Sequence, residues 1–325
     1  MTFEFETVPE STLDRMREIN AQLAAADLPD PATAEGLATL RATTFRVPAP
    51  TELTPVERAV SGPAGAATVR VIRPAGPVTG VVFHVHGGGF VLGAPADDDA
   101  VNDLLARTAG VAVVSARYRL APEHPYPAGL DDCLAAAAWL AGAAAAEFGT
   151  DRIVVSGYSA GGHLAVQTLL RLRGEFPDLF ARVVGASLVF GVYDLARTPS
   201  SRSAAPDTPV LPPRWIDRFV GMAFPGLDRE QLRDGGVSPL YADLHGMPPA
   251  LFTVGDRDPL LDDSLFMAAR WRAAGGASEL AVWPESPHGF VGMTPPSGVP
   301  AQSRINAWVK ALLARTPLRP GPWAG

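Results

Sequence analysis

Cysteine and lysine are almost absent from this chain of 325 residues, which contains one of each, Cys133 and Lys310. A single cysteine excludes an internal disulfide and any metal cluster built from several cysteines, and it is typical of a reducing compartment. We therefore expect a cytoplasmic location. The formal net charge is -7, so the chain lacks the basic excess of a nucleic-acid-binding protein, and we expect no nucleic-acid partner.

Long apolar runs are missing as well. The longest, residues 133–146, is mostly alanine and too short to cross a bilayer. The N-terminus is acidic where a signal peptide would be basic, and no apolar core follows it. These absences predict a soluble protein with no membrane span. Because 47% of the residues are hydrophobic, the chain can still bury a large core.

Strand-like and helix-like segments alternate along most of the chain. The predicted strands are short β-branched runs at residues 67–72, 81–84, 111–116, 153–156, 183–190, 250–254 and 280–283. The predicted helices lie at 100–108, 130–148, 160–173, 261–274 and 302–315. This alternation predicts an α/β fold with a largely parallel sheet and helices on both faces.

Two segments, residues 1–45 and 195–235, interrupt this alternation. In each segment apolar residues recur at helical spacing. They are Leu13, Met16, Ile19 and Leu23 in the first segment and Trp215, Ile216, Phe219 and Met222 in the second. Long insertions often serve as lids or binding walls, so each segment is a candidate for such a role. Each could instead merely cover a sheet edge. The core then comprises residues 46–194 and 236–325.

A serine stands at a tight turn from strand to helix in residues 152–163, RIVVSGYSAGGH. Glycines flank Ser159 with the G-x-S-x-G spacing of a nucleophile elbow, in which a strained turn lifts the hydroxyl clear of the sheet. Because so short a pattern also occurs by chance, the rest of the chain has to supply a base, an acid and an oxyanion site.

Three consecutive glycines follow an early predicted strand in residues 83–90, FHVHGGGF. Glycine runs cost backbone entropy, so a close approach or an unusual dihedral angle needs them. His86 and Gly87 begin this HGGG motif, which forms the oxyanion loop of some α/β-hydrolases. A flexible turn is the alternative, but the two motifs together favour an oxyanion loop.

The base is found by elimination, since the order in this fold is serine, acid, histidine. His163 lies in the first turn of the helix after Ser159, and His245 precedes the strand that supplies the best acid. His288, after the last predicted strand, remains.

The acid is open from spacing alone. Asp256 and Asp258 follow the strand at 250–254, and Asp194 follows an earlier strand. Aspartates also occupy turns and helix caps for local reasons. The pattern favours Asp258 or Asp256 over Asp194.

Motifs in the right order closely resemble the hormone-sensitive-lipase-like family of α/β-hydrolase esterases. They are HGGGF (86–90), YRLAPEHPYPA (118–128), GYSAGG (157–162), SPLYADLHGMPPA (238–250), DPLLDD (258–263) and HGF (288–290). The resemblance extends from residue 81 to the C-terminus. It implies the α/β-hydrolase fold, a small-molecule ester as substrate, and no metal or other cofactor. It also implies a helical cap over the pocket, formed by residues 1–45 and 195–235, with the apolar stripe of the first segment at the mouth of the active site.

The resemblance also implies site residues. The triad would be Ser159, Asp258 and His288. The oxyanion hole would come from amides near Gly88, Gly89 and Ala160, and the pocket would include Phe90, Trp215 and Phe219. Glu123 and His124 are expected to brace the framework.

One position departs from the family pattern. The residue before the serine is usually aspartate in the family, and it is Tyr158 here. That position has no role in the bond-making steps, so hydrolysis is not in doubt. The phenol could narrow the pocket, bind a polar substrate group, or simply pack against the cap.

Other functions stay open. The same triad could cleave an amide or N-acetyl group of a natural product, which the sequence cannot separate from ester cleavage. A non-catalytic small-molecule binder is disfavoured, because the plant gibberellin receptor resembles this family but lacks the triad histidine, whereas His288 is present here. The sequence also leaves a homodimer open.

Overall fold

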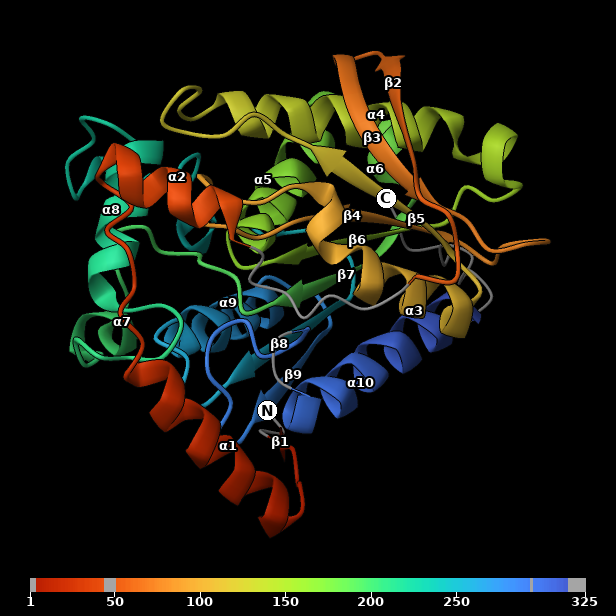
Figure 1. Ribbon diagram of the computed structural model, residues 1–325. Coiled ribbons are helices and arrows are strands. Elements are labelled where there is room, and N and C mark those ends of the chain that lie inside the picture. The colour runs from red at the N-terminus through yellow and green to blue at the C-terminus, as the bar shows by residue number, and fades with distance from the viewer. Residues whose placement is uncertain (1–3, 44–50, 293–294, 315–325) are drawn as a thin grey trace.

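The computed structural model describes residues 4–43, 51–292 and 295–314, whose strands form one nine-stranded sheet (Figure 1). The strand order is β1-β9-β8-β7-β6-β4-β5-β3-β2. Among these described strands, β3 runs antiparallel to both of its neighbours, and the other neighbouring pairs are parallel. The bounds are Glu4–Phe5 (β1), Val56–Gly62 (β2), Gly65–Ile72 (β3), Val81–Val85 (β4), Ala112–Arg117 (β5), Ile153–Tyr158 (β6), Val183–Val189 (β7), Ala250–Gly255 (β8) and Ser278–Trp283 (β9).

Helices cover both faces of this sheet. Their bounds are Glu10–Ala24 (α1), Ala34–Ala42 (α2), Asp99–Ala109 (α3), Ala128–Phe148 (α4), Ala160–Glu175 (α5), Pro177–Phe180 (α6), Pro199–Ser203 (α7), Pro213–Ala223 (α8), Leu261–Ala273 (α9) and Pro295–Ala314 (α10). Short 3-10 turns lie at Pro95–Asp98 (η1), Gln231–Arg233 (η2) and Pro239–Tyr241 (η3). The predicted fold class, an α/β-hydrolase fold with a mostly parallel sheet, is confirmed.

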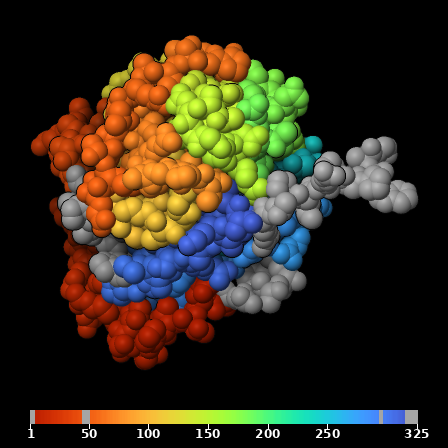
Figure 2. Space-filling model, turned by 90° about the vertical axis from the view of Figure 1, so that its right-hand side faces the viewer, coloured from red at the N-terminus to blue at the C-terminus, as the bar shows by residue number. Residues whose placement is uncertain are grey.

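The two faces of β4 show why its sequence is apolar at every position except the buried His84. Val82 packs with Leu105 of α3 and Val309 of α10 on one face. Phe83 and Val85 belong to the larger core that includes residues of α4 and α5 on the other face. Figure 2 shows α10 (blue) at the surface between N-terminal residues (red) and α3 (yellow). Because no face of the strand meets water, the usual alternation of polar and apolar residues is absent.

Two edge strands were missed from the sequence. β1 has two residues, which is too short for any periodicity, and it pairs with Ala281 and Val282 of β9. β2 is largely exposed along its length and pairs only with β3 among the described strands. An edge strand with little burial has no apolar stripe, so its sequence carries no strand signal.

Of the first predicted cap segment, α2 lies beside α8 of the second (Figure 1), whereas α1 lies against α10. Trp215 of α8 donates to the carbonyl of Pro29 at 3.1 Å, just before α2. The predicted boundary between the N-terminal cap segment and the core, at residues 45 and 46, lies outside the described residues. The division of the chain into cap and core stays a prediction. In the described parts of the chain, no helix is long and apolar enough to cross a membrane.

Candidate active site

Ser159 stands at the turn between β6 and α5 with φ 55° and ψ -122°, a conformation that few residues other than glycine adopt. The neighbouring glycines permit close packing around it. A Cβ on Gly157 would lie 2.2 Å from the Gly161 carbonyl oxygen, and one on Gly161 would lie 2.1 Å from the Val85 carbonyl oxygen. The elbow predicted from the G-x-S-x-G spacing therefore exists, and the glycines allow its packing.

His288 connects the serine to an aspartate. Its Nε2 lies 2.8 Å from Oγ of Ser159, and its Nδ1 lies 2.8 Å from Oδ2 of Asp258. The other carboxylate oxygen of Asp258 accepts the amide hydrogen of Leu260 at 2.8 Å. Asp258 and His288 are 3% and 7% exposed, so this pair is shielded from water. The structure thus brings together the three predicted triad residues in an arrangement that permits proton transfer from serine to histidine.

The two other candidate acids have different partners. Asp194 accepts the amide hydrogen of Ala196 at 2.9 Å and the hydroxyl of Tyr241 at 3.0 Å. Asp256 lies beside Arg257, and partial burial raises its pKa above the ordinary value. Of these three aspartates, Asp258 is the one that is hydrogen-bonded to His288.

The histidines rejected on chain order lie elsewhere. His163 is fully buried, with Nδ1 3.1 Å from the carbonyl oxygen of Val192. Burial lowers its pKa to about 4, so the ring is neutral at pH 7. His245 is exposed and pairs with Asp243.

The HGGG loop makes the close approaches that its glycines suggested. Gly88 and Gly89 have φ angles of 117° and 61°. A Cβ on Gly88 would lie 2.1 Å from the carbonyl oxygen of Leu92, and one on Gly89 would lie 2.4 Å from the ring of Phe219. Both glycines line the same cavity as Ala160, the first residue of α5. Amides at a helix N-terminus have no intrahelical acceptor, so they favour a developing negative charge.

His86 supports this loop by packing and by hydrogen bonding. Its ring stacks on Tyr118 with centroids 4.2 Å apart, and its Nδ1 lies 2.8 Å from the carbonyl oxygen of Gly87. The Tyr118 hydroxyl donates to the His86 carbonyl oxygen at 3.0 Å. Burial lowers the pKa of His86 to about 4, so the imidazole is neutral and fixes the loop by packing and hydrogen bonding.

A cavity of about 390 Å³ opens above Ser159. Predicted pocket residues line it, and these are Phe90, Tyr158, Trp215 and Phe219. Helix α2 also contributes Leu40 and Arg41, which the sequence analysis missed because the apolar pattern of so short a helix is weak.

The position of helix α1 differs from the one expected, in which its apolar stripe covers the mouth of the site. None of its residues lines the cavity within the described chain. Helix α1 contacts α10 instead. Its fully buried Met16 lies beside Ser297 of α10, and the serine Oγ is 3.4 Å from the methionine Sδ. Among the described helices of the two predicted cap segments, α2 and α8 line the cavity.

Arg41 joins α2 to two loops of the core. It forms a bidentate pair with Glu123 at 2.7 and 2.8 Å and donates to the carbonyl oxygens of Ala121 at 2.9 Å and Val91 at 3.1 Å. The hydrogen bonds from Arg41 lower the pKa of Glu123 to about 2. Glu123 braces the framework as expected, and its partner was not foreseen because it lies far away in the sequence.

Tyr158 is 3% exposed and directs its hydroxyl away from the nucleophile. The hydroxyl donates to Oε1 of Gln302 on α10 at 3.1 Å. The Tyr158 ring meets His84 edge to face with centroids 5.0 Å apart. Packing between the core and α10 is therefore a sufficient reason for an aromatic residue at this position.

Comparison with known proteins indicates the family of this chain. A family model described as the alpha/beta hydrolase fold matches residues 82–292. Carboxylesterase NlhH of Mycobacterium tuberculosis is 37% identical over 302 residues, covering 86% of this chain and 91% of that protein. An acetyl-hydrolase of Streptomyces hygroscopicus is 32% identical over 232 residues, covering 69% and 72%.

Solved structures agree. The hyperthermophilic esterase of Pyrobaculum calidifontis is 28% identical and superposes with a TM-score of 0.76, covering 94% of this chain and 99% of that one. The thermophilic carboxylesterase EstE1, cloned from a metagenomic library, is 28% identical with a TM-score of 0.75, covering 95% and 100%. Fold, motifs and relatives lead to one assignment: the chain belongs to the hormone-sensitive-lipase-like family of α/β-hydrolases.

Proposed function

We propose that this protein is a serine carboxylesterase that hydrolyses short to medium acyl esters through Ser159, His288 and Asp258. The observation that carries the proposal is the distance of 2.8 Å between Oγ of Ser159 and Nε2 of His288. The names of the relatives, which are carboxylesterases and esterases, support an ester as the bond that is cleaved.

In the acylation step, His288 takes the hydroxyl proton as Oγ of Ser159 attacks the ester carbonyl carbon, because a neutral hydroxyl is a weak nucleophile. The negative charge that develops on the carbonyl oxygen is stabilised by amides near Gly88, Gly89 and Ala160. Removing one such donor typically costs about 3 kcal/mol of transition-state stabilisation. His288 then protonates the leaving alcohol, and the acyl group remains on the serine.

Deacylation repeats these steps with water as the nucleophile. His288 takes a proton from water as the water oxygen attacks the acyl carbon, and it returns the proton to Oγ of Ser159 as the carboxylic acid leaves. Asp258 accepts a hydrogen bond from Nδ1–H throughout, which fixes the tautomer and stabilises the imidazolium ion.

The cavity supports short to medium acyl groups as those that are removed. Its volume is about 390 Å³, and α8 lines it with apolar side chains that would contact an acyl chain. Each methylene buried there contributes about 0.8 kcal/mol. The name of the Streptomyces relative favours an acetyl group as one of those removed. The cytoplasmic location and a homodimer stay predictions.

The test is a panel of p-nitrophenyl acetyl, butyryl, hexanoyl and decanoyl esters beside the matching p-nitroanilides, without added metal. We expect ester hydrolysis, loss of it in Ser159→Ala, and a phosphonate adduct whose mass maps to Ser159. Full activity of Ser159→Ala, or an adduct on another serine, would contradict the mechanism. Faster turnover of the anilides than of the esters would contradict the esterase assignment and favour the alternative, an amide hydrolase.

A further inference from the structure

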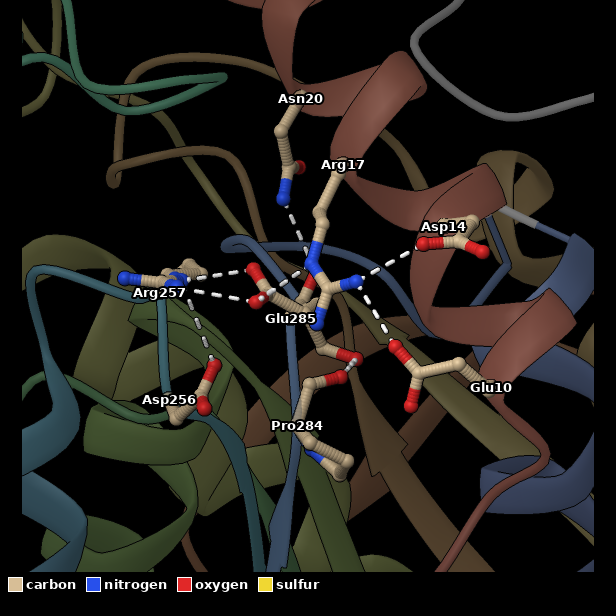
Figure 3. A network of polar contacts seen from close by, with 9 residues as sticks. Glu10, Asp14, Arg17, Asn20, Asp256, Arg257, Pro284 and Glu285 are labelled. Atoms are coloured by element: carbon tan, nitrogen blue, oxygen red, sulfur yellow. Dashed lines mark hydrogen bonds and ion pairs between the residues drawn. The ribbon is translucent and has the colours of Figure 1, made fainter.

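Helix α1 contacts the loop that carries His288 at one residue of that loop, Glu285. Figure 3 shows Arg17 and Asn20 of α1 directed toward Glu285. Asn20 of α1 donates through Nδ2 to the backbone carbonyl oxygen of Glu285 at 2.9 Å. Arg17, one turn earlier, donates through Nε to Oε1 of Glu285 at 3.1 Å. A helix that contributes nothing to the cavity wall thus contacts the loop of the candidate base.

The backbone at Glu285 needs such support. Its φ angle is 51°, in the left-handed region that disfavours side chains with a Cβ. A residue held there stores about 1–3 kcal/mol of strain and keeps this conformation only if its surroundings fix it. The bond from Asn20 fixes the carbonyl, and the bonds to the carboxylate fix the side chain.

Glu285 also joins the loop of the base to the loop of the acid. Arg257, the residue before Asp258, donates to Oε2 of Glu285 through Nε at 2.9 Å and to Oε1 through Nη2 at 3.0 Å. The amide of Arg257 donates to the carbonyl oxygen of Ser286 at 3.1 Å. The same carboxylate therefore binds α1 on one side and the loop after β8 on the other, as Figure 3 shows.

The charges suit a fixed contact. The Glu285 side chain is 13% exposed, and the hydrogen bonds from Arg257 and Arg17 hold its pKa below the ordinary value, so it is ionised. Arg17 is itself oriented by Glu10 at 2.9 Å and Asp14 at 2.8 Å on its own helix. Charge-assisted bonds to a largely buried carboxylate are stronger and shorter than bonds between exposed neutral groups.

We propose that Glu285, held by Arg17 and Asn20 of α1 and by Arg257, is a positioning residue for His288. In this arrangement α1 sets the distance between the imidazole and Ser159 without touching the substrate. The inference rests on the proposed function, because it assigns His288 the role of base. Since a displacement of about 1 Å in a reacting group costs up to roughly a hundredfold in rate, a loosened loop lowers turnover.

The kinetic test compares the double variant Arg17→Ala/Asn20→Ala with Arg15→Ala. Arg15 is the matched control, because it lies on the same helix and forms an exposed pair with Glu18. We expect the double variant to lose roughly tenfold in kcat with KM little changed, and Arg15→Ala to behave as the wild type. An equal loss in both would assign the effect to the helix as a whole and overturn the inference.

A second measurement does not depend on turnover. The proton between Nδ1 of His288 and Asp258 is observed by low-field proton NMR, and we expect its signal to broaden through faster exchange in the double variant but not in Arg15→Ala. Should the double variant fail to fold, Glu285→Gln provides the same two readouts, because it keeps the side-chain shape and removes the charge.

The outcomes separate the two proposals. An unchanged kcat and an unchanged proton signal, in whichever of these variants folds, would overturn the positioning role and leave the esterase intact. A wild type that cleaves no ester, while the proton signal still depends on Arg17 and Asn20, would overturn the proposed function and uphold the positioning of His288.

Discussion

The carboxylate of Asp258 and the imidazole of His288 share a hydrogen bond of 2.8 Å, although 30 positions of sequence separate them. The two residues follow neighbouring parallel strands, β8 and β9, whose C-terminal ends lie at the same edge of the sheet. Asp194 follows β7 at this edge, yet its carboxylate binds Tyr241. Adjacent strand ends bring several aspartates near the site, and side-chain direction selects one of them.

Replacing each of these aspartates by asparagine should show which one serves as the acid of the triad. Asp258→Asn should lower the acylation rate by on the order of 10⁴, because the amide holds the histidine in the wrong tautomer. Asp194→Asn is the control and should leave the rate of the folded protein near that of the wild type. Single-turnover kinetics with p-nitrophenyl acetate measure both, and the reverse order of effects would mean that the acid is misassigned.

The oxyanion loop should not tolerate a side chain at Gly89. With φ at 61° and a Cβ 2.4 Å from the Phe219 ring, Gly89→Ala forces the loop to move. We expect kcat to fall by about 10²–10³, as when one oxyanion donor is lost.

The control for this change is Gly142→Ala, on α4, where a Cβ meets no atom within 4 Å. It should raise the free energy of unfolding by roughly 0.5–1 kcal/mol, because alanine loses less backbone entropy in a helix. Normal turnover in Gly89→Ala would show that its amide is not needed.

The pair between Arg41 and Glu123 should make stability depend on pH. Hydrogen bonds from Arg41 lower the pKa of Glu123 from 4.5 to about 2 in the folded protein, so the pair stabilises the fold above pH 4.5 and loses this effect as the pH falls toward 2. Because Glu123 is half exposed, the contribution is at most about 1 kcal/mol. Urea unfolding of the wild type and Glu123→Gln should give a difference near pH 6 that shrinks in acid. A difference independent of pH would mean that the charge plays no part.

Removal of the Tyr158 hydroxyl should affect stability more than chemistry. Tyr158→Phe leaves Oε1 of Gln302 without the donor at 3.1 Å. A buried acceptor that loses its partner costs about 1–3 kcal/mol, so the melting temperature should fall. Turnover of acetyl esters should stay close to that of the wild type. An unchanged melting temperature together with an altered substrate preference would instead assign the hydroxyl to substrate binding.

The sequence by itself determined the central strands, the long helices and the two glycine motifs. Strands such as β4 and β6, and long helices such as α4, follow from apolar runs and helical spacing, which act within one element and need no distant partner. Two of the motif glycines have an equally local cause, because a Cβ on Gly157 would meet Gly161 and one on Gly88 would meet Leu92. The close contacts of Gly161 and Gly89 are instead with distant parts of the chain, the Val85 carbonyl and the Phe219 ring. Resemblance to a family added the cap and the triad as expectations.

Only the tertiary structure decided which distant groups meet. It selected Asp258 over Asp256 and Asp194, placed α1 on α10 instead of over the cavity, and paired Arg41 with Glu123. These outcomes depend on the directions of side chains and the packing of whole elements, and no residue type or spacing within one segment encodes them. An apolar stripe indicates that a helix must bury one face. Which element covers this face is determined only in the folded structure.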